Sequence, residues 1–207
     1  MSIFMIEYIS CKYRQRGMSM KKIYIVTTYT GTVLSYLIRK ISKTPYAHVS
    51  IALNEDLKPM YSFGRLNPKT PIFAGFVEEN INEGLYAIRK NTMCRVYSLE
   101  VTDSQYNDIY KNIMFVSENR KKFDYDVMAL IYLIINRPRQ AKYKYVCSHF
   151  VADMLIKSNV DMFNKPSYSI RPDYFYDNEQ LSLEYEGFLS RYGAEETSYT
   201  TYLAKVQ

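Results

Sequence analysis

The sequence predicts an α+β fold in which helices pack against a mostly antiparallel sheet. Two kinds of pattern carry this prediction. Residues 22–27 are β-branched and aromatic, and residues 48–53 alternate between apolar and small or polar side chains, as strands do. Residues 106–116 and 147–158 instead repeat their apolar residues at helical spacing. The two patterns are interspersed along the chain, without internal repeats.

The first predicted elements are a strand over residues 22–27 and a helix that follows it. Thr28 or Thr30 can cap this helix, and Pro45 ends the linker behind it. The apolar residues of the helix recur every three or four positions: Val33, Leu34, Leu37, Ile38 and Ile41.

Residues 48–53 and 60–64 are predicted to pair as a hairpin across the turn at 54–56. Strand alternation places the bulky side chains of both strands on one face. The other face then carries small residues together with His48. Such a face permits close approach of a helix, or leaves a cleft.

From residue 86 onward, both strands and helices are predicted. Residues 86–101 hold one or two strands, and Thr102 with Gln105 forms a capping box for the next helix. The remaining expectations are a buried helix over 125–135 that Pro138 closes, a helix over 147–158, and an edge strand over 181–189. Residues 71–83 fit neither pattern clearly.

The length of 207 residues fits one domain, which we expect over residues 21–207, preceded by an uncertain N-terminal extension over 1–20. Three cysteines are too few for a disulfide scaffold, which favours a reduced, cytoplasmic setting. A secreted or lipid-anchored protein, with Cys11 at the end of a weak signal, is the alternative. No apolar run reaches the roughly 20 residues that span a bilayer, so no transmembrane segment is expected.

The net charge of +6 indicates a mildly basic surface. No nucleic-acid partner is expected, because the chain has no recognisable binding motif or clustered basic face. Residues 137–144 form the densest basic segment, shortly before Cys147. Two interpretations of this segment are open: it lines the entrance to a site near Cys147, or it is a solvated loop. The oligomeric state is left open.

Cys147 is the candidate nucleophile. It begins the predicted helix 147–158, and Phe150, Val151 and Met154 lie on the same helical face, so the sulfur is directed inward. The positive end of the helix dipole favours a thiolate there. A buried, inert core cysteine is the alternative reading. Cys94, inside a strand pattern, is expected to be inert.

His48 is the candidate general base, because a histidine at the start of a strand can meet a cysteine at the start of a helix. His149 lies about 200° around the helix from Cys147, so it is expected to face away from the sulfur. Ser62 shares the predicted face of His48, which makes it the candidate third polar residue. It could equally be a small core residue.

No metal site or cofactor is expected. Cys147 and His149 form a C-x-H pair without a companion cluster of ligands. Residues 30–32 lack the lysine and the spacing of a phosphate-binding loop.

The order of histidine strand first and cysteine helix last distinguishes this chain from papain-like enzymes in their usual order. Over residues 21–192 it resembles the circularly permuted NlpC/P60 group, the permuted papain-like enzymes of the YiiX/YaeF type. The matching segments are Tyr46-Ala47-His48-Val49-Ser50-Ile51-Ala52-Leu53, Met60-Tyr61-Ser62-Phe63-Gly64, Tyr145-Val146-Cys147-Ser148-His149-Phe150-Val151-Ala152 and Arg171-Pro172-Asp173-Tyr174-Phe175.

The resemblance implies a cysteine hydrolase that cleaves an amide or ester bond through a thioester. Cys147 would be the nucleophile and His48 the base. The third position, often Glu or His in the family, would fall on or near Ser62, which departs from that pattern. The implied substrates are peptides, wall peptides or acyl compounds. Two alternatives stay open: a weak or inactive binding module on the same fold, and a lipid acyltransferase-like enzyme.

Overall fold

The computed structural model describes residues 19–30, 45–67, 74–134, 137–176 and 178–194. The predicted helix over residues 33–41 and residues 1–18, with Cys11, lie outside this part of the chain. Within it the fold is α+β, with a mostly antiparallel sheet and four α-helices. No helix among these residues is long and apolar enough to cross a membrane.

The main sheet has six strands in the order β4-β3-β2-β1-β5-β8, and every neighbouring pair is antiparallel. A separate parallel pair joins β6 to β7. The strands are β1 (Met20–Tyr29), β2 (His48–Ala52), β3 (Met60–Arg65), β4 (Ala74–Glu79), β5 (Met93–Thr102), β6 (Asp124–Tyr125), β7 (Lys144–Tyr145) and β8 (Ser182–Phe188).

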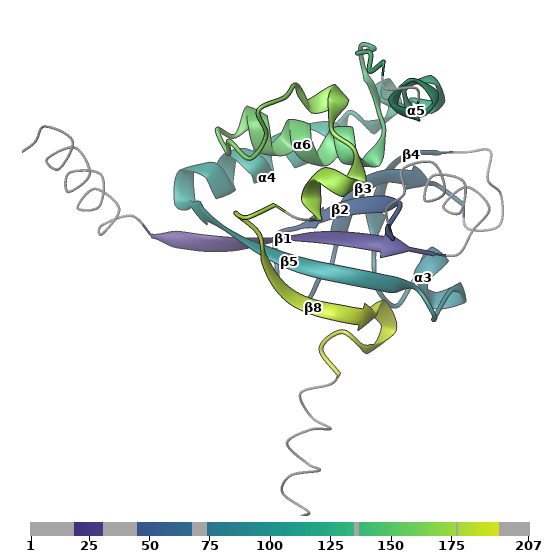
Figure 1. The fold of residues 1–207 in the computed structure, drawn as a ribbon, viewed down its shortest axis with the longest axis vertical. Coiled ribbons are helices and arrows are strands. Elements are labelled where there is room, and N and C mark those ends of the chain that lie inside the picture. Colours follow the sequence, from purple (N-terminus) through teal and green to yellow (C-terminus); the bar gives the residue numbers. More distant parts are fainter. Residues whose placement is uncertain (1–18, 31–44, 68–73, 135–136, 177, 195–207) are drawn as a thin grey trace, which may run out of the picture.

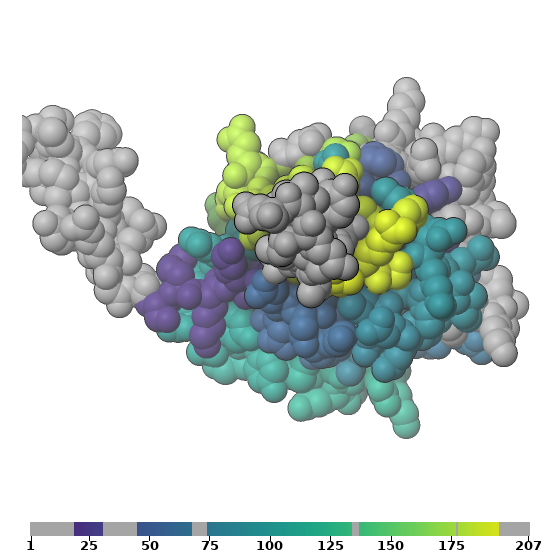
Figure 2. All heavy atoms as spheres, turned by 90° about the horizontal axis from the view of Figure 1, so that it is seen from below, coloured from purple at the N-terminus to yellow at the C-terminus, as the bar shows by residue number. Residues whose placement is uncertain are grey.

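The predicted hairpin is confirmed, since β2 pairs with β3 and Ile51 lies opposite Tyr61. The expected edge strand is also confirmed as β8, which pairs only with β5 in the six-stranded sheet. Figure 2 shows atoms of this C-terminal part of the chain, in yellow, on the surface of the molecule. The segment that fitted no pattern contains β4, which pairs with β3.

The helices are α3 (Gly84–Ile88), α4 (Asp103–Glu118), α5 (Val127–Ile134) and α6 (Cys147–Lys157). The predicted capping box of α4 is present, with reciprocal bonds between Thr102 and Gln105. α4 and α6 lie together on one face of the sheet (Figure 1). Residues 86–88, expected to be strand, belong instead to α3.

Two clusters of buried side chains lie on opposite faces of the sheet, as strand alternation requires. The larger cluster joins the sheet to α4 and α6, with Ile51 and Phe63 meeting Phe150. The smaller one lies on the other face and includes Met60 and Tyr86.

Helix α5 differs from its expectation. It was predicted to be buried, yet Val127, Met128 and Ile131 are exposed, and Ala129 and Leu133 carry its packing. An uninterrupted apolar run has no periodicity, so the sequence could not indicate which face would be covered.

Candidate active site

The candidate site lies where β2 begins and α6 begins. Cys147 is the first residue of α6 and is 6% exposed. The helix is fixed by its buried face, with Phe150 and Val151 fully buried, and by the hydroxyl of Ser148, which donates to the carbonyl of Ile170 at 2.6 Å. The first turn of α6 therefore presents the sulfur from a rigid element.

His48 is the first residue of β2, so its ring lies at the end of that strand rather than midway along it. Its pKa is raised well above the ordinary value of 6.5. Burial of the ring acts to lower this pKa, but the charge of Glu79 and hydrogen bonding with Cys147 and Glu79 outweigh it. The structure thus brings the two sequence-predicted residues together from segments nearly a hundred positions apart.

Glu79, the last residue of β4, is the acid of the site. Its carboxylate oxygens lie 3.0 Å and 3.2 Å from His48 Nε2. Burial acts to raise the pKa of Glu79, but the charge and hydrogen bond of His48, with hydrogen bonds from Ser50 and Tyr86, lower it overall. Glu79 and His48 therefore form an ion pair through Nε2 of the imidazole.

Two hydroxyl groups hold Glu79 in place. Ser50 donates to Glu79 Oε2 at 2.5 Å and lies two residues after His48, on the same face of β2. Tyr86 of α3 donates to the same oxygen at 3.3 Å, and its phenol also lies 3.4 Å from the hydroxyl of Thr28. The carboxylate is oriented by groups from two separate elements, β2 and α3, as a group that must position an imidazole requires.

Gly64 provides the room for this pair. A Cβ on Gly64 would lie 3.4 Å from His48 Cε1 and 3.7 Å from Glu79 Oε1. Ordinary contact distances leave space for alanine but not for a longer side chain pointing the same way. The small residues of the hairpin face thus make space for the imidazole and the carboxylate.

Ser62, the residue predicted for the third position, has a different partner. Its hydroxyl donates to the main-chain carbonyl of Val49 at 2.6 Å, and the residue is fully buried. The geometry gives the place beside the imidazole to Glu79. Ser62 belongs to the small core of the hairpin, the second reading that the sequence allowed.

Tyr125 is a further residue of the site that sequence reasoning missed. It ends β6, and burial first and then the charge of Cys147 raise its pKa, so the phenol is neutral and lies within electrostatic range of the sulfur. Tyr145, another tyrosine close in sequence to Cys147, instead donates to Asp153 at 2.6 Å. Tyr125 is therefore a neutral hydroxyl group in the neighbourhood of the candidate nucleophile.

The other cysteine and histidine of the described residues, Cys94 and His149, take no part in this arrangement. Cys94 is fully buried, and burial raises the pKa of its thiol to about 12, so it is unreactive at neutral pH. His149 is 5% exposed and packs against Tyr145 rather than facing Cys147. Among the described residues, no group of three or more His, Cys, Asp or Glu side chains is placed to hold a metal ion.

Neither protein-family models nor curated protein sequences match this chain. The class of protein must therefore be inferred from the site itself. That site comprises a cysteine at a helix N-terminus, an imidazole at a strand start and a carboxylate on a third element.

Proposed function

We propose that this chain is a cysteine hydrolase that cleaves an amide or ester bond through a thioester on Cys147. The observation that carries the proposal is the convergence of Cys147, His48 and Glu79 from α6, β2 and β4. Nucleophile, base and orienting acid are the three parts of a catalytic triad, which is recognised by geometry and roles rather than by sequence position.

The proposed reaction has two stages. The Cys147 thiolate attacks the substrate carbonyl carbon, forming a tetrahedral oxyanion. The protonated His48, held by Glu79, gives its proton to the leaving amine or alcohol, and the C–N or C–O bond breaks to leave a thioester. Water then attacks the thioester while His48 accepts its proton, releasing a carboxylic acid and the free cysteine.

The oxyanion requires hydrogen-bond donors placed where negative charge develops. The main-chain N–H groups in the first turn of α6 are suited to this role, because they have no partner within the helix. The neutral phenol of Tyr125 is the second candidate donor.

The chain order of histidine, acid and cysteine supports the permuted papain-like arrangement that the sequence resembles. Glu79 also bears on the alternative of an inactive accessory module. That alternative drew its support from a serine in the third position, whereas a carboxylate occupies the place beside His48. The active enzyme is therefore the better reading, with peptides, wall peptides and acyl compounds as the substrate classes to screen.

The test is a search for the acyl-enzyme. The protein is mixed with short p-nitrophenyl acyl esters and with p-nitroanilide amides, quenched in acid, and analysed by peptide mass spectrometry. We expect release of nitrophenol or nitroaniline together with an acyl group on Cys147 and none on Cys94. Release that continues at the same rate in Cys147→Ala would contradict the proposal.

A further inference from the structure

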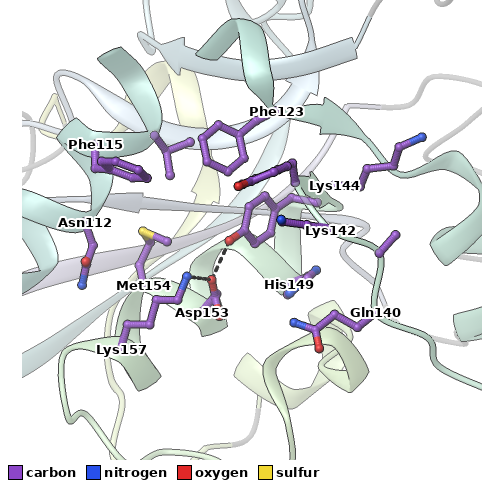
Figure 3. Close-up of a pocket in the computed structure, with 14 residues that line it drawn as sticks. Asn112, Phe115, Phe123, Gln140, Lys142, Lys144, His149, Asp153, Met154 and Lys157 are labelled. Atoms are coloured by element: carbon purple, nitrogen blue, oxygen red, sulfur yellow. Dashed lines mark hydrogen bonds and ion pairs between the residues drawn. The ribbon is translucent and has the colours of Figure 1, made fainter. Parts of the chain in front are cut away.

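A cavity outside the candidate active site lies beside α6. It has a volume of about 260 Å³ and is enclosed by α4, α6 and the segment 140–144 that leads into β7. Figure 3 shows Asn112 of α4 and Lys157 of α6 on one side of it and Gln140 on the other. None of Cys147, His48 and Glu79 lines this cavity.

His149 is a buried polar group on the wall of the cavity. The residue is only 5% exposed, and neither ring nitrogen has a hydrogen-bond partner among the described residues. Its ring lies near two aromatic rings, with the centroid of Tyr145 at 4.5 Å and that of Tyr168 at 6.5 Å. A buried polar group without a partner costs about 1–3 kcal/mol, so such groups normally bind water or a ligand.

Burial lowers the pKa of His149 to about 4, so the ring is neutral at physiological pH. A neutral imidazole has one N–H donor and one acceptor nitrogen. The cavity wall therefore offers both kinds of hydrogen bond. That combination suits a heteroaromatic ring with mixed donors and acceptors better than a plain anion.

Aromatic side chains form another wall. Phe123 lies edge-on to Tyr143, with ring centroids 5.6 Å apart, and close to Tyr145 at 5.9 Å. Flat aromatic surfaces bind flat rings by stacking, which contributes about 1–3 kcal/mol for a nucleic-acid base. Phe115 extends the same surface on α4.

The charge of the cavity is positive. Lys142, Lys144 and Lys157 line it, against the single carboxylate of Asp153. That carboxylate is already neutralised by Lys157 at 2.7 Å and accepts a hydrogen bond from Tyr145. Lys142 and Lys144 form no ion pair with a described residue, and the one charge contact of Lys142 there is with the Tyr143 ring, whose centroid lies 4.9 Å from Nζ. Neither ammonium group is neutralised by a carboxylate of the described residues, so both are available to an anion.

We propose that this cavity binds a small heteroaromatic phosphate, of the size of a nucleoside monophosphate. The base would stack on the exposed ring of Tyr143, with Phe123 edge-on beside it, and form hydrogen bonds with His149, and the phosphate would lie at Lys142 and Lys144. The volume is somewhat below the 300–1,000 Å³ of sites for drug-sized ligands, which fits one nucleoside with its phosphate at the rim.

The two histidines of the chain make this proposal testable by NMR. With ring-¹³C histidine, the Cε1–H signals report separately on the candidate active site and on the cavity. The four ribonucleoside monophosphates are titrated into the full chain, beside the matching nucleosides and inorganic phosphate. We expect at least one monophosphate to shift the His149 signal, to leave that of His48 in place, and to bind more tightly than its nucleoside.

Variants locate the binding. The double variant Lys142→Gln, Lys144→Gln should weaken the dissociation constant of that nucleotide at least tenfold, whereas Lys111→Gln on the exposed side of α4 should not change it. Cys147→Ala should bind the nucleotide as tightly as the wild type does. The binding proposal is therefore tested independently of the hydrolase proposal. An unmoved His149 signal at millimolar concentrations of all four nucleotides would overturn the proposal. Equal affinity in the double variant would also overturn it.

Discussion

Replacing Glu79 with glutamine should lower kcat/KM of the proposed hydrolysis by about 10²- to 10⁴-fold, the range that a positioned acid–base group contributes. The amide keeps the size of the side chain but removes the charge that holds the His48 proton. The loss should appear mainly in kcat, because the acid orients the imidazole rather than binding substrate. The measurement is steady-state kinetics on the ester or amide found in the screen, across a range of pH.

Two control variants separate this effect from a general loss of folding. Glu78→Gln changes the neighbouring residue on β4, whose exposed carboxylate accepts a hydrogen bond from Ser117, and it should leave kcat/KM unchanged. Ser62→Ala should lower the free energy of unfolding by about 1 kcal/mol through loss of its bond to Val49, without moving the pH profile. A Ser62 variant that shifted the pH profile as strongly as Glu79→Gln would reverse the assignment of the third residue.

The two histidines should titrate on opposite sides of the ordinary value of 6.5. His48 should remain protonated above neutral pH because Glu79 and Cys147 stabilise its charged form. His149 should remain neutral down to about pH 4 because burial disfavours its charge. The ¹³Cε1 signals, assigned with His48→Gln and His149→Phe, give both curves in one pH series. Two curves with midpoints near 6.5 would contradict the structure.

These shifts predict how stability depends on pH. The raised pKa of His48 gives a contribution that is complete below 6.5 and is lost as pH rises through the folded-state pKa. The lowered pKa of Glu79 gives a contribution that is present above 4.5 and is lost as pH falls through its folded-state pKa. The ion pair should therefore stabilise the fold most between about pH 4.5 and 6.5.

His149 adds an opposing effect in acid. Below pH 6.5 the unfolded chain takes up a proton that the folded chain does not, so stability should decrease toward pH 4 by about 3 kcal/mol. His149→Phe should remove this acid-induced decrease, which urea unfolding at pH 7 and pH 4.5 would measure. An equal decrease in the free energy of unfolding of His149→Phe would show that groups other than His149 cause the acid sensitivity.

The two halves of the candidate site could be predicted because each has a strong local pattern. The alternation after His48 identified a strand, and the apolar spacing after Cys147 identified a helix with an inward-facing sulfur. The scarcity of histidine and cysteine left few other pairs to consider. Strand alternation also explains why Ser62 shares a face with His48.

Glu79 could not be found in this way, because its role depends on the register of a third strand. β4 pairs with β3, and Glu79 lies opposite Met60 in that pairing. No local sequence pattern links Glu79 to His48. Residues 71–83 show no clear alternation, so neither the strand nor its last residue could be placed. The one sequence feature that could have indicated an acid here is the pair of glutamates at the end of Ala74–Glu79.

Tyr125 and Tyr86 were missed for a related reason. Tyr125 reaches the site through the two-residue pairing of β6 with β7, which leaves no periodicity in the sequence. Tyr86 lies on a five-residue helix that the sequence suggested was strand. Contacts made by such short elements depend on tertiary packing rather than on local propensity.

The most direct test of the central claim is the rate at which iodoacetamide alkylates Cys147 between pH 5 and 9, in the wild type, His48→Ala and Glu79→Gln. Peptide mass spectrometry follows Cys147 and Cys94 in the same sample. The account predicts that Cys147 reacts at pH 6 at least about tenfold faster in the wild type than in His48→Ala, with Cys94 almost unmodified, because a protonated His48 is the proposed partner of the reactive sulfur. A Cys147 that reacts no faster than Cys94, with no dependence on His48, would contradict it.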